Sequence, residues 1–153
     1  MKLAHFFSNY FTVRDEMVNA VRNLTRDQLD WIPPNHSTSI GRLLAHIAET
    51  EYWWISVVAQ KQVAPAQADF ARFEKARRLD DILWLLDLCL ADTRAYLENE
   101  EIEDWDDVMY DVEGRDEKVT KRWLVWHVVE HQARHRGQVF MLMRMLGVDV
   151  PHV

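Results

Sequence analysis

The sequence predicts an all-α fold: a four-helix bundle in a single domain over residues 1–153. Apolar residues recur at helical spacing in four long segments of the chain. Hydrophobic residues make up 48% of the sequence, and only four Gly and four Pro interrupt it, which is too few for a turn-rich β fold. Four amphipathic helices with connections of unequal length are typical of a bundle.

The first two helices are separated by Pro33 and Pro34, which cannot continue a helix. We expect the first helix from about Lys2 to Leu24, followed by a short turn over residues 25–29. The second begins near residues 37–39, where hydroxyl side chains can cap free backbone N–H groups, and continues to about Gln60. The apolar stripe of the first helix contains Leu3, Phe6, Tyr10, Val13, Met17, Val21 and Leu24. The inner face of the second contains Leu43, His46, Thr50, Trp53 and Val57.

The third and fourth helices are expected at residues 80–98 and from about Thr120 to just before Gly147, a residue typical of helix C-termini. The acidic segment between them, residues 99–119, is irregular or forms a short hairpin that turns at Glu113 and Gly114. The buried face of the fourth helix is expected to contain Leu124, Val128, His131, Gln138, Leu142 and Met145.

Composition excludes several classes of function. The net charge is −7 and no block of Lys or Arg occurs, so nucleic-acid binding is disfavoured. No segment reaches the roughly 18 apolar residues that a membrane span needs. A single cysteine rules out an internal disulfide and fits a reducing compartment. We therefore expect a cytoplasmic protein that acts on a small molecule.

The histidines indicate a metal site. His131 and His135 are four residues apart, so they share one face of the last helix and can hold one ion. His46 lies on the apolar stripe of the second helix and can supply a third nitrogen. Three protein ligands leave a coordination position for water or substrate, as in catalytic rather than structural zinc sites.

The pattern around these histidines leaves alternatives open. His127, His131 and His135 form a row, and one helix cannot easily direct all three at one ion, so spacing alone allows 127/131 or 131/135. Residues 127–131 also match the inverted zinc-protease motif H-x-x-E-H, but too little chain follows for the further carboxylate ligand, and Glu130 is more simply solvent-facing. A di-iron bundle is disfavoured because no Glu-x-x-His pair occurs.

Two segments, SIGRLLAHIAETEYWW and VTKRWLVWHVVEHQARHRGQV, resemble the DinB-like (damage-inducible) superfamily of bacterial metal-binding four-helix bundles. The resemblance follows the helix order over the whole chain. It implies zinc or nickel bound by His46, His131 and His135, helices that do not simply alternate in direction, and a homodimer. Some branches resemble S-transferases that use bacillithiol, mycothiol or related thiols.

We expect a thiol cofactor or substrate to contact Trp53, His127 and Gln138, while Arg42 is either an anion ligand or a surface residue. Cys89 lies in an apolar run and is expected to be buried, so a reacting thiol has to come from outside the chain. Three hypotheses follow: a thiol-dependent S-transferase acting on small electrophiles, a metal-dependent hydrolase that uses metal-bound hydroxide, and a stress-response or binding module whose metal is structural or absent.

Overall fold

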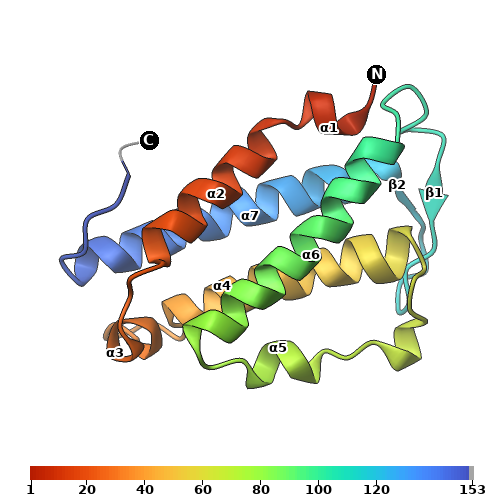
Figure 1. Cartoon of the computed structure of the whole chain (residues 1–153). Coiled ribbons are helices and arrows are strands. Elements are labelled where there is room, and N and C mark those ends of the chain that lie inside the picture. Colours follow the sequence, from red (N-terminus) through yellow and green to blue (C-terminus); the bar gives the residue numbers. More distant parts are fainter. Residues whose placement is uncertain (152–153) are drawn as a thin grey trace.

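The computed structural model describes residues 1–151 and has a mostly helical bundle architecture, which confirms the predicted fold class (Figure 1). Its four long helical segments are α2 (Asn9–Val21), α4 (Ile40–Glu51) continued by the π-helix η1 (Tyr52–Ala59), α6 (Leu79–Asn99) and α7 (Lys121–Met145). In chain order the elements are α1 (Leu3–Phe6), α2 (Asn9–Val21), α3 (Arg26–Asp30), α4 (Ile40–Glu51), η1 (Tyr52–Ala59), the 3₁₀-helix η2 (Pro65–Gln67), α5 (Ala71–Lys75), α6 (Leu79–Asn99), β1 (Met109–Tyr110), β2 (Val119–Thr120) and α7 (Lys121–Met145).

The helices do not alternate in direction along the bundle. The connection over residues 60–78 crosses back along the molecule, so α4 and α6 run the same way, whereas α2 and α7 run the opposite way (Figure 1). Helix α4 is central, since it packs against both α6 and α7. Leu44, Ile47 and Ala48 on this helix are fully buried in the core. This arrangement places residues of α4 beside residues of α7 that are far away in sequence.

Side-chain caps set where three of the helices begin. Thr25 forms a reciprocal capping box with Gln28 at the start of α3, where the sequence indicated a short turn. The Ser39 hydroxyl accepts a hydrogen bond from the Arg42 N–H at the start of α4. The Thr120 hydroxyl accepts one from the Trp123 N–H at the start of α7. The starts of α4 and α7 agree with the predicted second and fourth helices, and α6 begins at Leu79, one residue before the predicted start of the third helix.

The first predicted helix is interrupted at Phe7 and Ser8, so the expected continuous stripe is wrong at this point. Phe6 is 45% exposed, and Phe7 is buried in its place. The cause is tertiary: the Leu3 N–H donates to the Glu100 carbonyl at 3.0 Å, which ties the N-terminus to the end of α6. The Phe7 ring then packs edge-on against Trp126.

The second half of the predicted second helix is a π-helix, η1, rather than an α-helix. Its hydrogen bonds run from residue i to i+5, as in the 2.9 Å bond from the Gln60 N–H to the Ile55 carbonyl. This segment is apolar on nearly all sides and is buried by neighbours on several faces, with Trp53 only half-buried. Local widening of a helix is frequent near functional sites.

The acidic segment before α7 contains the short hairpin that the sequence indicated. Met109 pairs with Thr120 and Tyr110 with Val119 in an antiparallel register. The turn lies at Glu113 and Gly114, and Gly114 has φ +80°, which favours glycine. The hairpin loop lies next to the start of α7. Its residues 111–113 lie near η1.

A buried polar network crosses the middle of the bundle. Arg14 of α2 is 1% exposed and forms an ion pair with Glu51 of α4, which is 2% exposed. The Arg14 side chain also donates to the Gln132 side chain of α7 at 2.7 Å and to the Leu86 carbonyl of α6 at 3.0 Å. The hydroxyls of Tyr10 and Thr93 donate to Glu51. Each of the four long helices therefore contributes a partner, and the buried charges are paired and hydrogen-bonded.

We expect Arg14→Ala to lower the free energy of unfolding by about 3–5 kcal/mol, because it leaves the Glu51 carboxylate buried without its cation. Urea denaturation followed by circular dichroism measures this change. The matched control is Arg26→Ala, since the Arg26–Asp30 ion pair is solvent-exposed and its loss should leave the midpoint nearly unchanged. Equal effects of the two substitutions would contradict a structural role for the buried pair.

Candidate metal centre

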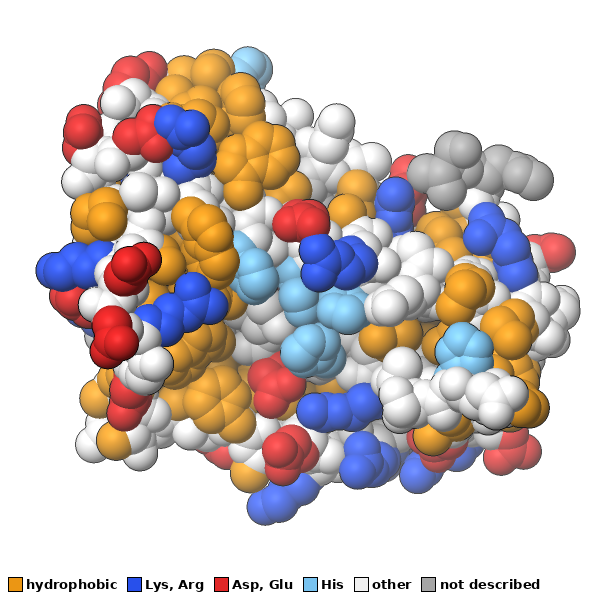
Figure 2. All heavy atoms as spheres, turned by 180° about the vertical axis from the view of Figure 1, so that it is seen from behind, with side chains coloured by type: hydrophobic (Ala, Val, Ile, Leu, Met, Phe, Trp, Pro, Cys, Tyr) orange, Lys and Arg blue, Asp and Glu red, His pale blue; other side chains and the backbone are white. Residues whose placement is uncertain are grey.

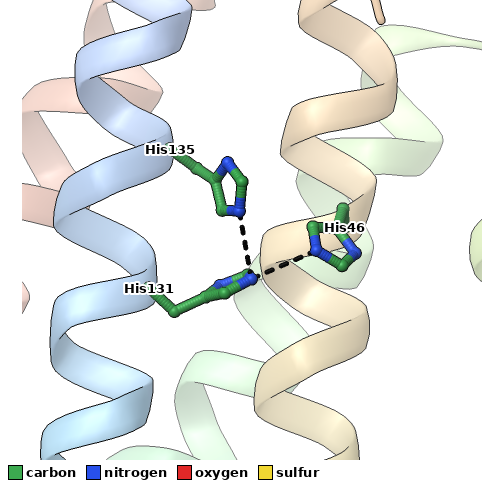
Figure 3. A group of neighbouring side chains, drawn as sticks. All are labelled: His46, His131 and His135. Atoms are coloured by element: carbon green, nitrogen blue, oxygen red, sulfur yellow. Dashed lines mark hydrogen bonds between the residues drawn. The ribbon is translucent and has the colours of Figure 1, made fainter. Parts of the chain in front are cut away.

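Three imidazoles from two helices meet on one side of the bundle. The Nε2 atom of His131 on α7 lies 3.1 Å from Nε2 of His46 on α4 and 3.1 Å from Nε2 of His135 one turn further along α7 (Figure 3). The ring centroid of His46 lies 4.8 Å from that of His131 and 5.2 Å from that of His135, and the centroids of His131 and His135 are 4.3 Å apart. The three residues predicted to share a site therefore converge as expected, although His46 and His131 are 85 residues apart in the sequence.

The cluster has the dimensions of a three-histidine metal site. One ligand atom from each residue lies within 4.8 Å of the others. Zinc–nitrogen bonds of about 2.0 Å in tetrahedral geometry place ligand nitrogens about 3.3 Å apart, close to the two measured separations. Without an ion, three facing Nε2 atoms cannot all find a hydrogen-bond donor among themselves. A cation accepts all three lone pairs, so the cluster can bind a metal.

Two of the imidazoles have a side-chain partner at Nδ1, the ring nitrogen that does not face the cluster. Nδ1 of His46 lies 3.2 Å from a carboxylate oxygen of Glu49, which also lies 3.6 Å from the Arg42 guanidinium. Nδ1 of His135 contacts the side-chain oxygen of Gln138. An N–H at each Nδ1 leaves Nε2 with a free lone pair directed at the cluster, as outer hydrogen bonds do for metal-ligating histidines. Arg42 thus pairs with a carboxylate of its own helix.

The position of Gln138 differs from the one expected. The sequence placed it on the buried face of the last helix, but its side chain is exposed. At this point of α7 the buried residues are Val139 and Phe140 instead. Gln138 contacts His135 from the side opposite the cluster and does not line the pocket described below.

Burial keeps the α7 imidazoles neutral. Burial, aided by the neighbouring His135 and His46, lowers the pKa of His131 to about 3. Burial also lowers the pKa of His135, although its hydrogen bond with Gln138 opposes the shift. Neutral imidazole is the form that binds a metal, so at neutral pH no proton has to leave these two rings before a cation binds.

His127 does not belong to the cluster, which resolves the choice that spacing left open. Its ring centroid is 5.9 Å from that of His131, and it stacks on Trp123 with 4.8 Å between centroids and 6° between planes. Burial lowers the pKa of His127 as well. Glu130 is exposed and pairs with Arg134 of its own helix, as expected for a solvent-facing residue.

The cluster lies at the surface of an open pocket of about 650 Å³. Figure 2 shows a group of histidine side chains on one face of the molecule, with hydrophobic side chains beside them and charged side chains around them. Trp53, Thr50 and His127 line the pocket, as the sequence indicated, and the Thr50 hydroxyl lies 3.2 Å from His131 Nε2. Glu49, Trp54, Phe70 and Arg134 also line the pocket, and no helical pattern in the sequence indicated Phe70 or Arg134.

Comparison with known proteins identifies the family. The model of the DinB family matches residues 1–153. The chain belongs to the DinB family. This DinB-family protein shares its fold with a DinB-like protein of Bacillus cereus, at a TM-score of 0.72 and 21% identity over 97% of this chain and 95% of that chain. It is also similar to the DinB-like protein YjoA of Bacillus subtilis, at a TM-score of 0.69 and 24% identity over 95% of this chain and 94% of that chain.

At these identities the two solved structures support the fold of the DinB-family protein and nothing more specific. No curated protein matches the chain. Among the helices of residues 1–151, none combines the length and the apolar character needed to cross a membrane. The chemistry therefore has to be inferred from the site itself.

The low pKa of His131 predicts a pH dependence for the metal-free protein. The folded state binds the proton near pH 3 and the unfolded chain near the ordinary value of about 6.5, so this histidine's contribution to stability is complete above that value and is lost as the pH falls toward 3. Between neutral pH and about pH 5, the wild type should lose up to about 2 kcal/mol more stability than His131→Asn. Urea denaturation in the presence of a chelator measures both; equal losses would contradict the shift.

Proposed function

We propose that this DinB-family protein is a zinc or nickel enzyme that transfers a low-molecular-weight thiol to a small electrophile. The observation that carries the proposal is the convergence of three Nε2 atoms at the surface of an open pocket. His46, His131 and His135 would hold the ion, and imidazole suits both zinc and nickel. The pocket leaves room for a further ligand from solvent.

The chemistry of the site fits such a role. When bound, the cation supplies Lewis acidity, which favours the deprotonated form of a thiol or a water molecule at neutral pH. Glu49 and Gln138 orient two of the imidazoles, so we assign Gln138 to positioning His135 rather than to binding a thiol. Trp53 and His127 line the pocket and are proposed to contact the thiol or its acceptor, with neutral His127 able to receive a proton.

The chain's own cysteine is unsuited to the reaction. Cys89 is 2% exposed in the core, on α6, and is absent from the pocket lining. Burial, with a smaller contribution from Glu51, raises the pKa of its thiol to about 12. A thiol that is protonated and inaccessible cannot act as a nucleophile. This supports an external thiol as the reactant.

The metal part of the proposal is tested by metal analysis of the purified protein. Wild type should carry about one equivalent of zinc or nickel, and His46→Ala and His131→Ala should lose it, since two remaining imidazoles bind much more weakly. His36→Ala, which removes an exposed histidine away from the cluster, is the matched control and should keep the ion. A wild type that binds no added zinc or nickel would defeat the proposal and favour a binding module.

The reaction part is tested by thiol consumption with monochlorobimane as the electrophile and bacillithiol, mycothiol or glutathione as the donor. Metal-loaded wild type should turn over at least one thiol, His131→Ala should lose most of the activity, and Cys89→Ala should retain it. The turnover of Cys89→Ala distinguishes an external thiol from the chain's own. Metal-dependent hydrolysis of ester substrates without any thiol-dependent turnover would instead favour the hydrolase alternative.

A further inference from the structure

A second hollow lies beside the metal pocket, and the proposed reaction does not yet use it. It has a volume of about 640 Å³ and lies between η1, the loop over residues 61–66 and the hairpin residues 111–113. We call it the valine groove. Its apolar lining comes from Trp53, Val57, Val58, Val63, Pro65 and Val112.

Trp53 joins the valine groove to the metal pocket. Trp53 is a lining residue of both hollows, so the two adjoin at this residue. The ring is held by its neighbours, with centroids 6.4 Å from Trp54 and 5.8 Å from Phe70. A molecule with its reactive end at the histidines can therefore extend past Trp53 into the groove.

The chain leaves the valine groove open because the wall that faces η1 is built from small side chains. The loop reads Val63-Ala64-Pro65-Ala66, and none of these residues reaches across the hollow. Apolar surface left in contact with water is unfavourable, at about 25 cal/mol per Å². An open apolar hollow that adjoins a polar site is typical of a ligand-binding pocket.

The charges at the rim favour an uncharged occupant. Asp111 is paired with Lys118 at 3.1 Å, which neutralises it. The two other ionisable lining residues, Lys61 and Glu113, have opposite charges. The groove therefore offers no excess charge to an anionic or cationic tail, and its valines favour hydrocarbon.

We propose that the valine groove binds the uncharged apolar part of the substrate, so that the electrophile acted on at the histidines carries an alkyl chain or an aromatic group. This inference rests on the proposed metal-dependent function. In this inference, residues 57–66 and the hairpin select the substrate by its apolar part. The histidines bind its reactive end. Trp53 contacts the point where the two parts of the molecule meet.

The test uses zinc-loaded full-length protein and a series of alkyl hydroxamates, whose common head group binds zinc and whose tails differ in length. Isothermal titration calorimetry should give an affinity that rises about fourfold per methylene from acetohydroxamate through butanohydroxamate and hexanohydroxamate, until the groove is filled. An affinity that does not change with tail length would overturn the proposal.

Matched variants locate the effect. Ala64→Trp fills the valine groove, and Val63→Asp places a charge in it; both should abolish the gain with tail length while binding acetohydroxamate like wild type. Gln67→Trp introduces the same side chain at an exposed residue of η2 outside the lining and should keep the gain in affinity with tail length. If affinity still rises with tail length in both groove variants, the tail does not bind in the valine groove and the proposal is overturned.

The two levels of the proposal fail differently. Wild type that holds no zinc, or that holds zinc but does not bind acetohydroxamate, would overturn the proposed function and this inference with it. Acetohydroxamate binding without a dependence on tail length would overturn the inference alone. Zinc content and circular dichroism of each variant show whether it keeps the fold and the metal.

Discussion

The buried Arg14–Glu51 ion pair is the constraint on which the placement of the histidines depends. A guanidinium and a carboxylate that are both inaccessible to water have to stay paired, so the helices carrying them cannot slide independently. Gln132 of α7 joins the same network and directly follows His131, while Glu51 directly follows Thr50. The register between α4 and α7 is therefore fixed beside the point where His46 and His131 meet.

Much of the fold could be predicted because it is encoded locally. The boundaries of α6 follow from apolar periodicity, and those of α7 from periodicity, the Thr120 hydroxyl cap and Gly147, all visible in neighbouring residues. The break between α1 and α2 could not be predicted, because it depends on a contact between Leu3 and Glu100 across the chain. Arg14 did leave a signal: it lies between Tyr10 and Met17 on an apolar stripe, where a charge requires a buried partner.

For the site, helical spacing was sufficient to group His131 with a neighbour four residues away, but not to choose which one. The choice depends on the rotation of α7 against α4, which is a tertiary property, and His127 is turned toward Trp123. The π-helix was unpredictable for a similar reason, since an apolar run on all sides is compatible with several helical periods. Phe70 in the pocket wall follows from the path of a loop that no periodic pattern describes.

The parallel course of α4 and α6 has a consequence for how members of such a fold can diverge. Parallel neighbours oblige the chain to return along the whole bundle before the next helix begins (Figure 1). This return segment contributes Phe70 to the lining of the pocket that contains the three histidines. Its early part, residues 61–70, contributes no metal-binding histidine. Insertions and deletions there can reshape the pocket wall while the histidine cluster and the hydrophobic interior stay as they are.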